Sequence, residues 1–100
     1  MDLGVEAFRA WLQEHAEERV GCSGSTEGCP LAVYLSEREG RMCRVGAFEY
    51  GLAELLTERY PLPSWAQVFA TRVDVAYRGG TSLSGVQALC LLDQACKWAE

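Results

Sequence analysis

The end of the chain, residues 62–98, decides the predicted fold and reads LPSWAQVFATRVDVAYRGGTSLSGVQALCLLDQACKW. Its apolar spacing predicts two helices, over residues 65–77 and 85–98, joined by a hinge at residues 78–81. Ser64 is followed three residues later by Gln67, and Ser84 three residues later by Gln87. Each pair matches a capping box, in which the serine hydroxyl accepts a bond from a helix amide and the glutamine bonds back to the amide of the serine. These residues predict an architecture and carry no catalytic motif.

The rest of the chain predicts further short elements. Residues 3–18 have helical apolar spacing, residues 21–28 form a glycine-rich loop, and a second helix begins at Pro30 and ends at Gly40. Apolar residues alternate around residues 42–50, and residues 52–56 return to helical spacing. We therefore expect a mainly α, all-alpha fold. It would be a compact bundle of four to five short helices, with a short β-hairpin or strand around residues 42–50, in a single domain of residues 1–100.

Composition and charge narrow the classes of function. The chain has 100 residues, of which 49% are hydrophobic and 23% charged, as is usual for an ordered globular domain. Its net charge is −5, its arginines are scattered, and Lys97 is its only lysine, which argues against direct binding of nucleic acid. The start of the chain lacks the pattern of a signal peptide, and no apolar run approaches the roughly 18 residues of a membrane span. We therefore expect a cytoplasmic protein with no membrane partner.

The cysteines offer the first candidate chemistry. No Cys-x-x-Cys pair is present, and the spacings match no structural zinc site, so we predict no metal. Cys29 precedes the predicted helix start, where the positive end of the helix dipole lowers a thiol pKa, and Cys22 lies one loop away as its partner. The competing interpretation is that Cys29 ends a loop and packs inward. The five cysteines are Cys22, Cys29, Cys43, Cys90 and Cys96. A metal site could be imagined only from the first three of them together with His15.

Other polar residues predict structural roles. His15 is the only histidine and lies beside Trp11 on a helix edge, which is typical of a packed ring. Asp74 interrupts an apolar stretch, and no acidic residues follow it at alternate positions as a calcium loop requires. We expect Asp74 to bond loop amides or to pair with Arg72 or Arg78. We predict no cofactor.

Three segments of the chain resemble elements shared by a loose set of short bacterial and phage proteins. The segments are CPLAVYL at residues 29–35, LPSWA at residues 62–66 followed by VD at residues 73–74, and the serine-capped Ala-Leu helix of residues 84–92. The shared elements are Cys-Pro-x-Ala-x-Tyr-Leu and Leu-Pro-x-Trp followed by Val-Asp. The set has no assigned activity, so the resemblance implies a compact bacterial or phage domain and no catalytic residues.

Two functions from different classes follow as hypotheses. The first is a small acidic, non-enzymatic protein-binding module, a regulator or a phage or mobile-element inhibitor of a bacterial defence or nucleic-acid-handling enzyme. Its partner would be another protein, contacted through exposed carboxylates of residues 3–18 and through Phe48 and Tyr50. The alternative is a thiol-dependent redox or metal-binding protein that uses Cys22 and Cys29. A homo-oligomer with Phe48 or Trp98 packed across a two-fold axis is a further option.

Overall fold

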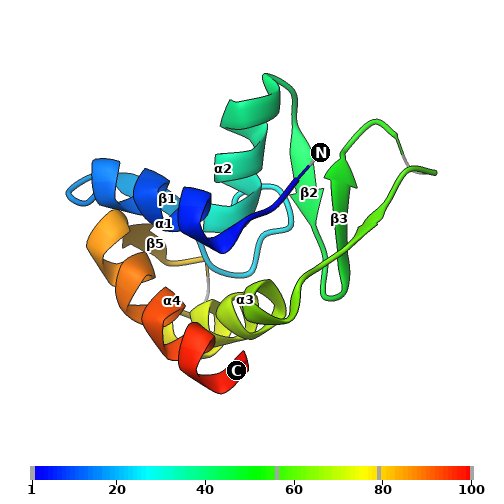
Figure 1. Cartoon of the computed structure of the whole chain (residues 1–100). Coiled ribbons are helices and arrows are strands. Elements are labelled where there is room, and N and C mark those ends of the chain that lie inside the picture. The colour runs from blue at the N-terminus through cyan, green and yellow to red at the C-terminus, as the bar shows by residue number, and fades with distance from the viewer. Residues whose placement is uncertain (1, 56, 79, 100) are drawn as a thin grey trace.

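The fold is mixed α/β. The computed structural model describes residues 2–55, 57–78 and 80–99, and for residues 98 and 99 the backbone alone. Helices hold 49% and strands 17% of the part of the chain that the structure describes, so the prediction of a mainly α, all-alpha bundle is wrong. The elements along the chain (Figure 1) are α1 (Val5–Glu14), β1 (Arg19–Cys22), α2 (Pro30–Glu39), β2 (Cys43–Val45), β3 (Glu49–Leu52), β4 (Tyr60–Pro61), α3 (Ser64–Ala76), β5 (Ser82–Ser84) and α4 (Gly85–Ala99).

The strands form two small antiparallel sheets. β1 pairs with β5 in a two-stranded ribbon, with Arg19 opposite Ser84 and Cys22 opposite Ser82. The prediction placed β1 partly in the loop of residues 21–28, because a four-residue strand containing Gly21 has little strand pattern of its own. Its partner lies about sixty positions later, so only the folded chain brings the two together. The ribbon is therefore a product of long-range pairing.

The second sheet has the strand order β2-β3-β4. β2 and β3 form a hairpin with Cys43 opposite Leu52 and Val45 opposite Tyr50, at the position predicted for a hairpin. The helical spacing predicted for residues 52–56 is wrong as far as residue 55, because Leu52 ends β3 and the chain then turns. Leu56 lies outside the described residues.

Helix ends follow the capping signals in part. The Ser84–Gln87 capping box is confirmed, since the Ser84 amide donates to Gln87 Oε1 at 2.8 Å and the Gln87 amide donates to Ser84 Oγ at 3.3 Å. The box at Ser64 is wrong: Pro63 is the N-cap, its carbonyl accepts from the Gln67 amide at 3.0 Å, and Gln67 Nε2 donates to the Leu62 carbonyl at 2.8 Å. A proline carbonyl thus serves where a serine hydroxyl was expected.

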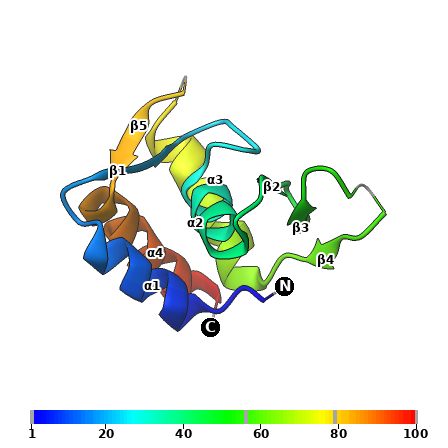
Figure 2. The same ribbon diagram turned by 90° about the horizontal axis from the view of Figure 1, so that it is seen from above.

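The core lies where α1, α3 and α4 meet α2. Phe8 is fully buried and has four aromatic neighbours, with ring centroids between 5.2 and 6.1 Å from its own. Figure 2 shows α1 and α4 side by side at one side of the molecule, the β2-β3-β4 sheet at the other, and α2 and α3 between them. This arrangement leaves the β2–β3 turn projecting beside α3. The aromatic neighbours of Phe8 are Trp11, Tyr34, Trp65 and Phe69.

Within the described part of the chain, no helix is both long enough and apolar enough to cross a bilayer. Trp98, which the sequence proposed for an interface, has a side chain outside the described residues. The hinge predicted at residues 78–81 includes Gly79, which is also outside them.

Candidate functional site

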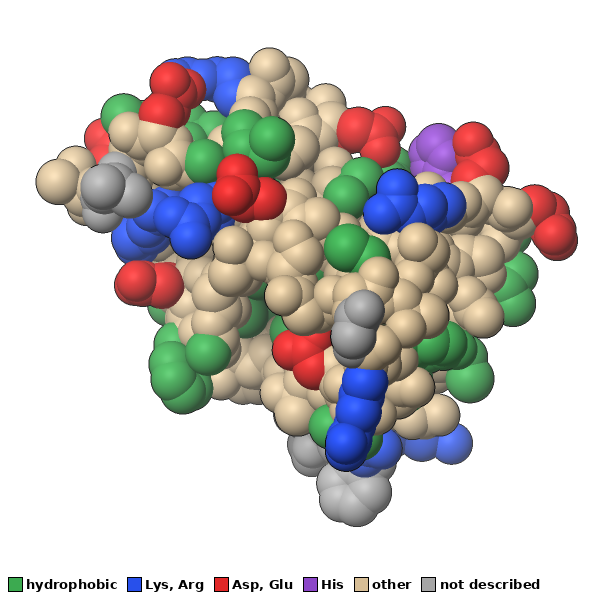
Figure 3. Space-filling view, turned by 180° about the vertical axis from the view of Figure 1, so that it is seen from behind, with side chains coloured by type: hydrophobic (Ala, Val, Ile, Leu, Met, Phe, Trp, Pro, Cys, Tyr) green, Lys and Arg blue, Asp and Glu red, His purple; other side chains and the backbone are tan. Residues whose placement is uncertain are grey.

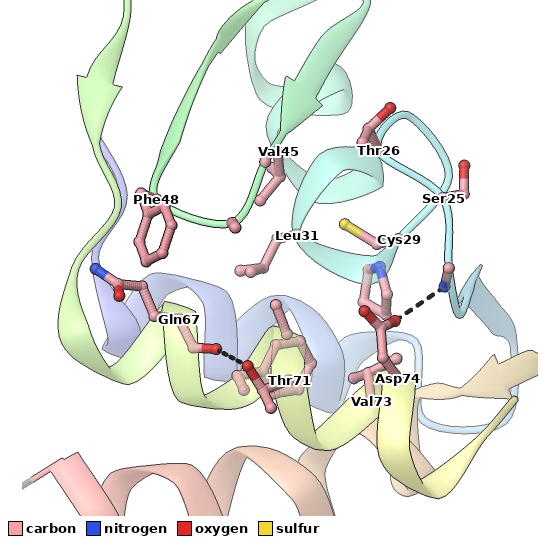
Figure 4. A pocket seen from close by; sticks show the side chains of 16 residues that line it. Ser25, Thr26, Cys29, Leu31, Val45, Phe48, Gln67, Thr71, Val73 and Asp74 are labelled. Carbon is pink, nitrogen blue, oxygen red and sulfur yellow. Dashed lines mark hydrogen bonds between the residues drawn. The ribbon is translucent and has the colours of Figure 1, made fainter.

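A cleft of about 370 Å³ separates the β2–β3 turn from α3 and from the start of α2 (Figure 4). Its lining combines buried apolar side chains with polar side chains that are exposed or half-exposed. This division suits a ligand that buries an apolar group and leaves polar groups at the edge. The apolar side chains that line it include Leu31, Val45, Phe69 and Val73, and the polar ones are Ser25, Thr26, Gln67, Thr71 and Asp74.

Phe48 stands at the mouth of this cleft and is 74% exposed. Its backbone is held on both sides: the Leu62 amide donates to the Phe48 carbonyl at 2.8 Å, and the Gly46 amide donates to the Glu49 carbonyl at 2.8 Å. Figure 4 shows the ring extending from the turn towards α3, close to Gln67. An exposed phenylalanine on a fixed turn loses little backbone entropy when a partner covers it.

The opposite wall of the cleft is the loop of residues 23–28, and Asp74 holds it to α3. Asp74 Oδ1 accepts a hydrogen bond from the Gly24 amide at 2.9 Å, which confirms the expected bond to a loop amide. The Val45 amide donates to the Thr26 carbonyl at 2.8 Å, so the same loop is also tied to β2. The wall is therefore connected to both neighbouring elements.

Asp74 also borders a second, more open hollow that continues along α3. The two hollows share Gly24, Thr71 and Asp74. The carboxylate thus stands at their junction, within reach of a ligand that runs along α3 from Phe48. The second hollow is lined by Ser23, Gly24, Thr71, Asp74, Val75, Tyr77 and Arg78.

Cys29 is the N-cap of α2, as predicted, and Figure 4 shows its sulfur at the cleft. Burial raises the pKa of the Cys29 thiol to about 11, although hydrogen bonds from the amides of Ala32 and Leu31 lower it. Desolvation thus outweighs the helix terminus, and the thiol is protonated at neutral pH. Cys29 is consequently a half-buried, weakly polar part of the wall.

The other cysteines are free thiols and do not gather into a metal site. Cys22 and Cys29 are both free, and Cys43 is fully buried in β2. In the described residues, no group of three or more His, Cys, Asp or Glu side chains is placed to hold a metal ion. His15 is the C-cap residue of α1, its ring is tilted against that of Trp11 with centroids 5.0 Å apart, and its Nδ1 lies 2.6 Å from Glu18 Oε2. It does not line the cleft.

Of the four residues proposed from the sequence as binding residues, Cys29 and Phe48 line the cleft. Cys22 lies in β1, and Tyr50 is 5% exposed and packs against Tyr60 with ring centroids 5.6 Å apart. The cleft also contains Gln67 and Thr71, which the sequence did not indicate as binding residues. The sequence carries little indication that these two residues line a cleft, because polar residues on a helix face ordinarily contact solvent.

Comparisons with protein-family models, with curated proteins and with solved structures find no match. The resemblance drawn from the three sequence segments stays a prediction.

Proposed function

We propose that this chain is a non-enzymatic protein-binding module, and that its cleft holds an extended segment of a partner protein with Phe48 as the anchor. The observation that carries this proposal is the 74% exposed Phe48 at the mouth of an apolar cleft. Aromatic side chains dominate the free energy of many interfaces when a neighbouring pocket completes their burial. Phe48 supplies the aromatic group, and the cleft beside it accepts an apolar side chain from the partner.

The fixed geometry of the turn supports the same proposal. Because the Phe48 carbonyl already accepts a bond from the Leu62 amide, partner binding does not have to order this part of the backbone. Met42 is 54% exposed and also apolar, yet it does not line the cleft. Phe48 and Met42 are thus both apolar and exposed, and they differ in whether they line the cleft.

The charges at the surface favour apolar contact over imitation of a nucleic acid. Figure 3 shows one face of the molecule, on which acidic and basic side chains are interspersed. The net charge of −5 is moderate for 100 residues. We keep a regulator or phage-carried inhibitor of a bacterial defence or nucleic-acid-handling enzyme as the setting of this proposal, with contact through the cleft and not through a uniform acidic surface.

The raised pKa of Cys29 counts against the alternative of a thiol-dependent redox protein. A thiol with a pKa of about 11 is almost entirely protonated at neutral pH, and the thiolate is the form that attacks disulfides and binds metals. Cys29 acts in our proposal as part of the cleft wall.

Selection of peptides from a random display library, followed by affinity measurement, tests the proposal. We expect Phe48→Ala to weaken the selected peptides by about tenfold or more, which is the usual effect of removing a central aromatic anchor. Met42→Ala is the matched control and should change the affinity by less than about twofold. Equal affinities for the wild type and Phe48→Ala would contradict the proposal.

A further inference from the structure

The cleft carries one charged side chain along its lining, and that charge is negative. Among the described residues that line the cleft, Asp74 is the only acidic one, and none is a lysine or an arginine. The ion pairs among the described residues join Arg9 with Asp93, His15 with Glu18 and Arg41 with Glu54, so none of them involves Asp74.

The position of this carboxylate is set by the fold. Asp74 Oδ1 accepts from the Gly24 amide at 2.9 Å, which orients the group at the end of the cleft (Figure 4). Its negative charge also contributes to the raised pKa of the Cys29 thiol, so its field reaches the cleft wall. An anionic group on a ligand would be repelled there, and a cationic group would be attracted.

The spacing along α3 suggests where a cation would lie on an extended ligand. Ala70 also lines the cleft, and Asp74 follows it by four residues on α3, a rise of about 6 Å at 1.5 Å per residue. Two residues of extended chain cover about 6.6 Å and point their side chains to the same side. An apolar side chain seated over Ala70 therefore places the side chain two positions along the ligand beside Asp74.

We propose that the partner segment is an extended stretch in which a bulky apolar residue is followed two residues later by lysine or arginine, with the cation held by Asp74. This inference rests on the proposed function, because it names the chemistry of the segment that the cleft takes. The apolar side chain lies over the floor of the cleft, beside Phe48 and Ala70. The cation then meets Asp74 where the two hollows join, and the chain continues along α3 towards Tyr77.

Three nine-residue peptides test the inference, each with a central phenylalanine, glycine and serine flanks, and lysine, glutamine or glutamate two residues after the phenylalanine. Amide chemical-shift titration measures their dissociation constants, including values in the millimolar range. For the wild type we expect the lysine peptide to bind about tenfold more tightly than the glutamate peptide, because attraction replaces repulsion at a half-covered site. The difference should shrink in high salt.

The variant Asp74→Asn removes the charge and keeps an oxygen that can accept from the Gly24 amide. In this variant the three dissociation constants should agree within about twofold, while Glu37→Gln, an exposed carboxylate on α2 away from the cleft, should keep the wild-type order. The inference is overturned if the wild type does not bind the lysine peptide more tightly than the glutamate peptide, or if this order of affinities survives in Asp74→Asn. If Phe48→Ala still weakens the binding of all three peptides equally, the proposed function stands without the inference about the cation. If no peptide binds, both the inference and the proposed function are contradicted.

Discussion

Replacing Gly85 by alanine tests the packing of α4 against α1, the contact that supports the core. A Cβ at position 85 would lie 2.4 Å from the His15 carbonyl oxygen and 2.5 Å from the Leu12 carbonyl oxygen. Both atoms belong to the backbone, so neither can rotate away. The start of α4 would have to move from the end of α1 by several tenths of an ångström.

That movement strains two hydrogen bonds as well as the packing. The Gly85 amide donates to the Glu18 carbonyl at 3.1 Å, and the Val86 amide donates to the Ala16 carbonyl at 3.0 Å. Overpacking costs about 1–3 kcal/mol, and each weakened hydrogen bond adds up to about 1 kcal/mol. We expect Gly85→Ala to lower the free energy of unfolding by about 2–4 kcal/mol, a large part of the stability of a domain of this size.

Urea denaturation followed by tryptophan fluorescence measures this difference. The matched control is Gly46→Ala, whose Cβ would meet only the Glu49 carbonyl oxygen at an ordinary 3.4 Å, and which should change the stability by less than about 1 kcal/mol. Gly85→Ala as stable as the wild type would refute the close approach of α4 to α1.

Three further predictions concern single side chains. Ser84→Ala should lower the free energy of unfolding by about 1 kcal/mol, whereas Ser64→Ala should change it by less than about 0.5 kcal/mol, because of the two serines only Ser84 caps a helix. Urea denaturation compares the two variants, and equal losses of stability would contradict the assigned caps. As pH rises from 9 to about 11, the unfolded chain loses the Cys29 proton before the folded chain does, because burial raises the pKa of this thiol in the folded chain. The free energy of unfolding of the wild type should therefore fall by about 2 kcal/mol relative to that of Cys29→Ala. Parallel curves of stability against pH for the two proteins would argue against burial of the thiol. Asp74→Ala should speed exchange of the Gly24 amide hydrogen about tenfold while Asp74→Asn should not, and equal exchange in both variants would show that the loop is held by other contacts.

The parts of the fold that the sequence predicted correctly are those encoded by neighbouring residues. Pro30 at the start of α2 and the left-handed Gly40 at its end, with φ of 68°, are local signals that do not depend on the rest of the chain. The capping pair Ser84 and Gln87 is local in the same way. At Ser64 the same pattern failed, because the preceding Pro63 has extended backbone and its carbonyl already accepts from the amides of Ala66 and Gln67.

The parts that the sequence missed depend on distant residues. The ribbon of β1 and β5 joins two strands of four and three residues, too short to show an alternating pattern. The cleft shows the same limit. Phe48 and Cys29 were noticed for their chemistry, whereas Leu31 and Phe69 have the spacing of ordinary core residues and are buried, and only the fold places them beneath a cleft.

The central claim is that a partner segment occupies the cleft beside Phe48. Amide chemical-shift mapping of the ¹⁵N-labelled protein with a display-selected peptide tests it most directly. We predict that the largest changes fall on residues 24–26, 45–48, 67, 69–71, 73 and 74, which line the cleft, and that they are lost in Phe48→Ala and kept in Met42→Ala. Changes confined to the outer faces of α1 and α4, or unaltered by the loss of the Phe48 ring, would contradict the claim.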